Sequence, residues 1–369
     1  MLTRRHTLLG AACAPALLAC SPGAGHAQAA QAIWRHGTVA PGDRAALLSE
    51  LVRYATLAPS SHNTQCWKFR VQAHVIAIAV EPDLSRRCPV VDPDDHHLWV
   101  SLGCAAENLV QAAQAHGLRA EPRFEPAGDG SVVVALEPTA VIASPLFQAI
   151  AERQCTRGDY DGMPLSTDDL HLLEGTGSGR GVRVMLRTDR PALEQTLQYV
   201  VAGNTAHLND PAFVAELKAW IRFGDEEALR LGDGLYSGSS GNPNLPRWIA
   251  GPLLGLVLTA KSENDKCARQ LRSSAGVAVF IAEAADKAHW VEAGRCDERF
   301  ALQTAALGIR NAFLNQPVEV AALRPQLASW LGVDGLRPDL VVRFGRGPTL
   351  PPSLRRPVAG CWPDGKGMQ

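Results

Sequence analysis

The chain has 369 residues, with 36 Lys and Arg against 37 Asp and Glu, so its formal net charge is −1. Hydrophobic residues make up 46% and charged residues 20%, a composition that excludes a disordered, collagen-like or coiled-coil chain. Near-neutral charge gives no signal for a nucleic-acid partner. The length predicts two domains, or one large domain built by repetition.

Residues 1–20 are predicted to be an export signal with a lipobox. Arg4 and Arg5 precede an uncharged apolar stretch that is too short to cross a bilayer but matches a signal-peptide core. Thr-Arg-Arg resembles a twin-arginine signal, and Leu-Leu-Ala-Cys, ending at Cys20, resembles a bacterial lipobox. We expect export by the twin-arginine route to the periplasm and a membrane anchor through lipid on Cys20 alone. Cleavage after Ala27 is the alternative.

The spacing of the cysteines does not predict a disulfide framework or a zinc site. Seven remain after Cys20, and no C-x-x-C pair occurs among them. Neither a zinc ribbon nor a thioredoxin-type pair is therefore indicated. Mostly buried thiols, with room for one disulfide, are the interpretation for Cys66, Cys88, Cys104, Cys155, Cys267, Cys296 and Cys361.

Hydrophobic periodicity alternates between helical and strand patterns along the chain. Helices are predicted over 43–57, 98–116, 144–155, 190–206, 210–222, 265–273, 294–313 and 320–331. Strands are predicted over 67–71, 74–80, 131–137, 182–187, 275–284 and 339–345. Few connections form β-α-β units, so the pattern favours an α+β fold over a doubly wound sheet.

The loop that follows the first predicted helix concentrates short polar groups. It reads Ala-Pro-Ser-Ser-His-Asn-Thr-Gln-Cys-Trp-Lys-Phe over residues 58–69. Pro59 ends the helix, and the side chains after it can hydrogen-bond a flat polar heterocycle or a phosphate. The alternative is a polar loop that only caps its own helix. The candidate ligand-binding residues here are Pro59, Ser60, Ser61, Asn63 and Gln65.

The run Asp92-Pro-Asp-Asp-His96-His97 has metal-ligand residue types. Adjacent histidines on a helix point about 100° apart, and acidic residues before a helix commonly cap it. We therefore assign no metal site to this run.

One pattern occurs twice. The register W-V-x2-G-x3-E-x7-A-x-G-[LI] begins at Trp99 and again at Trp290, an offset of 191 residues. A shorter match, Gln-Ala-Ile, begins at Gln31 and Gln148, an offset of 117. The chain is thus predicted to contain two related halves, 30–140 and 144–360. The second is longer by about 74 residues around 200–265, including a Gly- and Pro-rich stretch expected to be a loop.

The second half also carries a pair of arginines, Arg153 and Arg157, on either side of Cys155. Two guanidinium groups four residues apart next to a helix end can bind a dianionic phosphate. Two surface arginines are the alternative. Several common signatures are absent, because the chain contains no G-x-G-x-x-G, P-loop or G-x-S-x-G sequence.

The loop at 58–69 resembles the A-P-S-[SG]-x-N-x-Q-P-W-x-F signature of the FMN-dependent nitroreductase superfamily, with Cys66 replacing the usual proline. Arg153-Gln-Cys155-Thr-Arg157 resembles the Arg-x-[Ser/Thr]-x-Arg phosphate clamp of that family, with Cys155 in place of the hydroxyl residue. Weaker matches are Gln-Pro-Val-Glu, ending at Glu319, which resembles a segment beside the flavin ring, and the basic pair Arg355 and Arg356, which resembles a phosphate support.

The distribution of these signatures resembles the fused, Acg-like branch of the superfamily, over about residues 30–360. The first half has the A-P-S loop but reads Trp-Arg-His-Gly-Thr-Val at the clamp position, 34–39. The second half has the clamp, but a glycine-rich run at 175–181 stands where an A-P-S loop would lie. The resemblance implies a nitroreductase-like fold, an intrachain pseudo-dimer, one composite FMN site per chain and a lid insertion at about 200–265.

The resemblance also implies a function, namely two-electron reduction of a small electrophile by FMN, in a monomeric chain with a small-molecule electron donor and acceptor. Hydride transfer needs no nucleophile or general base from the protein, so we assign no catalytic residue. The alternative is a flavin-binding or sequestering protein with little turnover, because an exported reductase does not meet cytoplasmic NAD(P)H.

Overall fold

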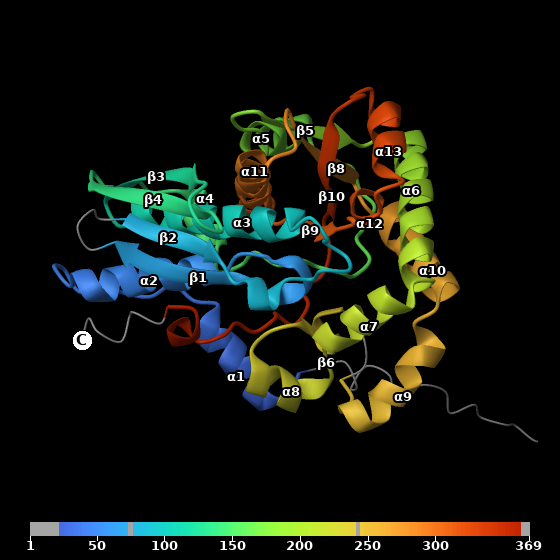
Figure 1. Ribbon diagram of the computed structural model, residues 1–369, viewed down its shortest axis with the longest axis horizontal. Helices are drawn as coiled ribbons and strands as arrows, with labels where there is room; N and C mark the ends of the chain where they lie inside the picture. Colours follow the sequence, from blue (N-terminus) through green and yellow to red (C-terminus); the bar gives the residue numbers. More distant parts are fainter. Residues whose placement is uncertain (1–21, 73–76, 241–243, 363–369) are drawn as a thin grey trace, which may run out of the picture.

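The computed structural model describes residues 22–72, 77–240 and 244–362. The predicted export signal and Cys20 lie outside these residues. The described chain has an α+β fold with two antiparallel four-stranded sheets (Figure 1). Within the described part, no helix is both long enough and apolar enough to cross a membrane.

The first half contains one sheet and one long buried helix. After α1 (Ala24–Ile33) and α2 (Arg44–Thr56) come β1 (Trp67–Gln72), β2 (Ala77–Pro82), α3 (His96–Ala115), β3 (Leu118–Glu125) and β4 (Ser131–Pro138). Asp43 caps α2 by accepting a hydrogen bond from the Ala46 amide. Helix α2 ends at Thr56, just before Pro59, so the A-P-S loop begins directly at its C-terminus.

The second half repeats this order with additions. It comprises α4 (Pro145–Ala149), α5 (Thr167–Thr176), β5 (Val182–Arg187), β8 (Gly276–Ala282), α11 (Lys287–Ala306), β9 (Arg310–Phe313), α12 (Gln316–Glu319), α13 (Arg324–Leu331) and β10 (Arg337–Gly345). The strand order β5-β8-β10-β9 matches β1-β2-β4-β3 of the first half position by position. Each half is therefore one copy of the same topology.

Helices α3 and α11, which carry the repeated sequence pattern, pack against each other at the centre of the molecule (Figure 1). A side chain at Gly103 would overlap the carbonyl oxygen of Val291, and one at Gly294 would overlap that of Val100. These two contacts are reciprocal, because each glycine meets the partner helix at the repeat-equivalent residue. Such reciprocity is the mark of an isologous, two-fold interface, here formed within one chain.

The extra residues of the second half lie between β5 and β8. They form α6 (Arg190–Leu208), α7 (Pro211–Trp220), β6 (Ile221–Arg222), α8 (Gly224–Leu231), β7 (Leu235–Tyr236), α9 (Arg247–Val257) and α10 (Ala260–Arg272). In Figure 1, α6 and α10 flank the second sheet, and α7, α8 and α9 continue below them. Helix α8 contacts α1, where Ala30 packs with Ala228 and Tyr236. The insertion thus reaches back to the first half.

Several predicted helices differ from the structure, including 210–222, whose last two residues form strand β6. The stretch 144–155 is helical only over Pro145–Ala149, and 294–313 is divided between α11 and strand β9. Gly308, with a φ of +67°, ends the latter helix early and turns the chain into the sheet. Strand β3 was not among the predicted strands, although its apolar residues alternate with the Arg and Glu residues that it carries as an edge strand.

Candidate functional site

A cavity of about 750 Å³ lies between the two halves and the insertion. From the first half it is lined by Pro59, Ser60, Ser61, His62, Val91, His97, Val100, Ser101 and Cys104. From the second half and its insertion come residues that include Arg157, Asn204, His207, Leu253, Leu254, Gln316, Glu319 and Arg343. The start of the A-P-S loop and the second clamp arginine, which are about 100 residues apart in sequence, therefore share one cavity.

The A-P-S loop has an unusual backbone. His62, Asn63 and Gln65 have φ angles of +48°, +53° and +53°. Non-glycine residues rarely adopt this left-handed region, which costs roughly 1–2 kcal/mol per residue. The loop therefore needs contacts from outside that hold it in place.

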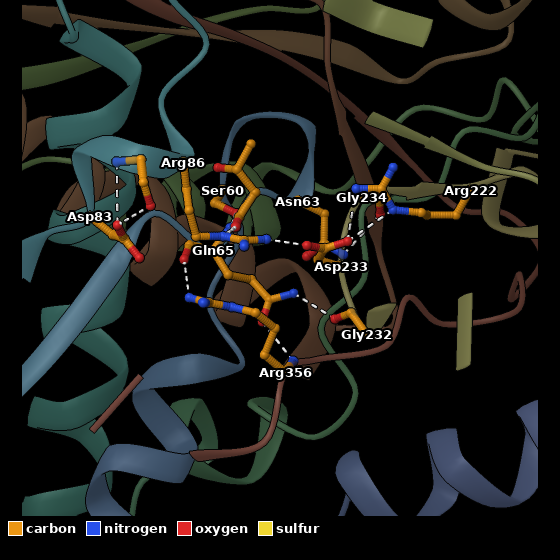
Figure 2. A network of polar contacts seen from close by, with 12 residues as sticks. Ser60, Asn63, Gln65, Asp83, Arg86, Arg222, Gly232, Asp233, Gly234 and Arg356 are labelled. Atoms are coloured by element: carbon orange, nitrogen blue, oxygen red, sulfur yellow. Dashed lines mark hydrogen bonds and ion pairs between the residues drawn. The ribbon is translucent and has the colours of Figure 1, made fainter. Parts of the chain in front are cut away.

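Asn63 supplies one set of these contacts (Figure 2). Its Nδ2 donates to the carbonyl of Gly234 at 3.0 Å and to that of Leu354 at 3.3 Å. Its Oδ1 accepts from Arg355 Nη1 at 3.0 Å. The side chain thus joins the loop to the insertion and to the C-terminal tail and points away from the cavity lining.

Gln65 supplies the second set (Figure 2). Its Nε2 donates to the Gly232 carbonyl at 2.8 Å, its Oε1 accepts from the Arg356 amide at 2.8 Å, and its amide donates to Ser60 Oγ at 2.9 Å. The Arg356 guanidinium donates to the Gln65 carbonyl at 2.7 Å. Gln65 and Arg356 therefore hold the loop against the insertion, outside the cavity lining.

Arg153 and Arg355 lie behind the loop. Arg153 is 4% exposed, forms an ion pair with Glu298 at 3.2 Å and donates to the Leu57 carbonyl at 2.7 Å. Arg355 donates to the carbonyls of Thr56 and Leu57 at 2.8 and 3.0 Å. Both guanidinium groups therefore occupy the C-terminal end of α2, where unpaired carbonyls attract cations.

The remaining predicted residues are divided. Arg157 and Glu319 line the cavity, and the Arg157 side chain has no hydrogen-bond or ion-pair partner within the described residues. Cys155 is half-buried, forms a β-bridge with Asn311 and is not among the lining residues. Cys66 is likewise outside the lining, whereas Cys104 is part of it. Of the predicted residues, Pro59, Ser60, Ser61, Arg157 and Glu319 therefore line the cavity, and the others do not.

Titratable groups in the lining are shifted toward their neutral forms. Burial and the charges of Arg157 and His207 lower the pKa of His62 to about 4. Burial and the charge of Asp92 raise the pKa of Glu319 to about 8. The cavity consequently presents a neutral His62 near the positive charge of Arg157, an environment suited to an anionic or polar aromatic ligand.

The repeat-related position on the other side of α3 and α11 is occupied by charged side chains. At the offset of 191, Glu292 corresponds to Ser101 and Arg295 to Cys104. Arg295 donates to Glu107 at 3.1 Å and to Glu292 at 2.6 Å. Gly179, in the glycine-rich run, lies directly against the Glu292 carboxylate. Small residues border the cavity on α3, and large charged residues stand at the matching points of α11.

This second position also has an arginine at the end of a helix, as Arg153 is at the end of α2. Arg299 donates to the Thr176 carbonyl at the end of α5 at 3.2 Å and to Glu107 at 3.0 Å. Glu107 is the repeat counterpart of Glu298, which pairs with Arg153. Each half thus ends a helix with an Arg–Glu pair, but the arginines come from different elements, and Arg299 is only half-buried.

Sequence reasoning did not select His62, Ser101, Asn204, His207 or Gln316 as individual ligand-binding residues, although all line the cavity. The repeat did distinguish Ser101, because the aligned position in the second half is Glu292. Gln316 Oε1 is buried without a hydrogen-bond partner in the described structure. No local pattern could have identified the two insertion residues.

Comparison with known proteins finds relatives among the nitroreductases. No protein-family model matches the chain. Proteins from two strains of Mycobacterium tuberculosis, provisionally named NAD(P)H nitroreductases, are 26% identical to it over 322 residues, which cover 84% of this chain and 90% of theirs. This likeness supports a place in the nitroreductase superfamily.

Two solved structures are also similar. A nitroreductase with bound FMN from Bacteroides fragilis is 15% identical, with a TM-score of 0.35, and covers 56% of this chain and 90% of its own. A nitroreductase with bound FMN from Desulfitobacterium hafniense is 17% identical, with a TM-score of 0.37, and covers 58% and 96%.

Proposed function

We propose that the protein is an FMN-dependent oxidoreductase of the nitroreductase type that reduces a small electrophile by two electrons, with one composite site per chain. The observation that carries this proposal is the cavity that combines Ser60 and Ser61 of the first half with Arg157 of the second. The similarity to NAD(P)H nitroreductases supports the reaction class.

The cavity suits FMN on two counts. Its volume of about 750 Å³ lies in the range of sites that hold a cofactor or a ligand of similar size. Its lining offers the Arg157 guanidinium, serine hydroxyls that include those of Ser60 and Ser61, and the buried Oε1 of Gln316, which has no hydrogen-bond partner in the described structure. Arg157 would hold the phosphate, and Ser60, Ser61 and Gln316 would bind polar atoms of the ribityl chain and ring. FMN would supply the two-electron chemistry.

The chain's own residues position the site. Arg153 and Arg355 neutralise the carbonyl end of α2 and thereby fix the start of the A-P-S loop. Asn63 and Gln65 hold the rest of the loop in its strained backbone. Leu253 and Leu254 of α9 line the cavity from the insertion, so they restrict water and large molecules. All of these contacts are made within the protein, so the chain's own residues set the shape of the site.

The position of α9, whose Leu253 and Leu254 line the cavity, favours a second candidate function. This candidate is a flavin-binding protein with little turnover. A helix of the insertion that covers the cavity would hinder entry of a nicotinamide donor. The two functions differ in the rate at which the bound flavin is reduced and reoxidised.

Anaerobic stopped-flow spectroscopy of the purified yellow protein tests both. An oxidoreductase requires that NADPH, NADH or a quinol bleach the flavin at catalytic rates and that a nitroaromatic or quinone restore the colour. Reduction by dithionite alone, with none of these donors active, would support the sequestering protein instead. A purified protein without bound flavin, and unable to bind added FMN, would contradict both.

We also propose export by the twin-arginine route to the periplasm, with a lipid anchor at Cys20. The contacts of the residues that follow Cys20 favour cleavage before this cysteine, and not the alternative cleavage after Ala27. His26 is fully buried and stacks on Tyr236 with ring centroids 4.2 Å apart, and the Gly23 amide donates to Asp225 at 2.6 Å. Cleavage after Ala27 would remove both contacts. Mass spectrometry of the mature N-terminus distinguishes an acylated Cys20 from an unmodified Gln28.

A further inference from the structure

Asp92, His96 and His97 form a buried cluster at the start of α3. Asp92 accepts hydrogen bonds from the amides of His97 and Leu98 at 3.0 and 2.9 Å, which orient its carboxylate toward the helix. The three residues are 4%, 0% and 5% exposed, respectively. One ligand atom from each lies within 4.8 Å of the others. The helix N-terminus thus places two imidazoles and one carboxylate around a common point.

His96 has one ring nitrogen engaged and one free. Its Nε2 lies 2.9 Å from Asp339 Oδ1, and Asp339 also accepts from the Ala282 amide at 2.8 Å. When Asp339 is ionised its carboxylate can only accept, so Nε2 then carries the ring proton and Nδ1 keeps its lone pair. That buried Nδ1 has no hydrogen-bond partner in the described structure.

His97 has both ring nitrogens buried and without hydrogen-bond partners among the described residues. Its Nδ1 lies 3.9 Å from Asp92 Oδ1 and 3.9 Å from Glu319 Oε1. Both separations are too long for hydrogen bonds, and they are close to, though slightly longer than, the distance between two ligand atoms of one tetrahedral metal ion. Buried polar atoms normally have partners, so the cluster calls for a bound species.

The donor atoms indicate which kind of ion would bind. Neutral imidazoles and carboxylates are the ligands of zinc and similar first-row divalent ions. Metal-bound histidines typically donate their second ring nitrogen to a carboxylate, which is the arrangement of His96 and Asp339. Asp92 and Glu319 would offset the charge of the ion. The nearby cations Arg337 and Arg324 both lie against Asp94, at 2.6 and 3.9 Å.

We infer that Asp92, His96 and His97 bind a divalent transition-metal ion of the zinc class, with Glu319 as the fourth ligand. This inference reverses the sequence-based assignment of no metal to the run 92–97. The two imidazole rings are adjacent on the helix with centroids 4.7 Å apart, and one ligand atom of each lies within 4.8 Å of a carboxylate oxygen of Asp92. The site would join α3 of the first half to α12 of the second, at the cavity wall that His97 and Glu319 share. It does not depend on flavin binding.

The test begins with the purified full-length protein, treated with a chelator and then dialysed against Zn²⁺. Metal content relative to protein should reach about one ion per chain. X-ray absorption at the zinc edge should show nitrogen and oxygen ligands and no sulfur. A zinc–sulfur signal would assign the ion to the cysteines and overturn the proposal. A zinc content near zero would overturn it too, and would leave ordered water as the partner of the imidazoles.

Variants then locate the site. His97→Gln should weaken zinc binding by at least tenfold in calorimetric titration, and Asp339→Asn, which acts through His96, should weaken it about 10–100-fold. His171→Gln is the matched control, because this exposed histidine lies on α5, which is not part of the cluster. Equal zinc affinity of wild type and His97→Gln would contradict the assignment. The Zn²⁺-induced rise in melting temperature should disappear in the same variants. Their own melting transitions show at the same time that they are folded.

Discussion

Arg153 and Glu298 form a buried ion pair with 3.2 Å between Nε and Oε1. The side chains are 4% and 0% exposed, and Arg153 uses a further nitrogen to bind the Leu57 carbonyl. Every contact of this arginine therefore lies behind the A-P-S loop and not in the cavity. Arg157, four residues later, is the clamp residue that faces the ligand space.

The two clamp arginines should consequently give different phenotypes. Arg157→Gln should weaken FMN binding by about 2–4 kcal/mol through loss of a charge-assisted contact to phosphate, and should leave riboflavin binding nearly unchanged. Arg153→Gln should weaken both flavins equally and lower the urea midpoint of unfolding, because Glu298 loses its partner. Fluorescence titrations with FMN and riboflavin measure both. A loss specific to FMN in the Arg153 variant would return the phosphate contact to that residue.

One site per chain follows from the two faces of the α3–α11 pair. Cys104→Arg places on α3 the side chain that Arg295 presents on α11, and it should abolish flavin retention because Cys104 lines the cavity. Cys104→Ala keeps the space and should retain about one FMN per chain. Released flavin, quantified against protein, measures the ratio. A ratio near two in the wild type would show that the Glu292–Arg295 face also binds flavin.

Much of the architecture could be predicted from the sequence. The α+β class and the two halves followed from periodicity and from the pattern shared by Trp99 and Trp290, because the buried faces of α3 and α11 must repeat where the helices pack. The short strand β9 could not be distinguished from the end of a helix, since its four residues, 310–313, are too few for a period.

The candidate site was harder to predict, because sequence motifs do not show which way a side chain points. Asn63 and Gln65 stand in the right loop, yet their amides bind backbone of the insertion and the C-terminal tail. Their direct contact with a cofactor stays a prediction. His207 and Asn204 enter the lining from helix α6, and only the folded chain brings that helix beside the loop.

Asn63 allows the backbone strain of the loop to be separated from its hydrogen bonds. Asn63→Gly removes the side-chain contacts to Gly234, Leu354 and Arg355 but tolerates the φ of +53°. Asn63→Ala removes the same contacts and adds a conformational cost of roughly 1–2 kcal/mol. We expect the Ala variant to be less stable than the Gly variant by about this amount in urea unfolding, and both to be less stable than wild type. Equal stability of the two variants would mean that the loop relaxes out of the left-handed region.

Glu298 makes the stability of the fold depend on pH. Burial raises its pKa from the ordinary 4.5 to about 7, although Arg153 acts in the opposite direction. A carboxyl whose pKa is higher in the folded state binds its proton more tightly there, so its contribution is fully present below about pH 4.5. That contribution declines between pH 4.5 and 7 and is lost above. Each pKa unit corresponds to about 1.4 kcal/mol, which gives a loss of about 3 kcal/mol across this window.

Glu298→Gln, which resembles the protonated form, should remove this slope. The difference in unfolding free energy between the variant and wild type should therefore grow in favour of the variant by about 3 kcal/mol as the pH rises from 4.5 to above 7. Urea unfolding of the flavin-free proteins across this range measures it. Glu121→Gln, on the exposed edge strand β3, is the control and should follow wild type at every pH. If the difference between Glu298→Gln and wild type is independent of pH, the carboxyl keeps an ordinary pKa and Arg153 fully offsets its burial.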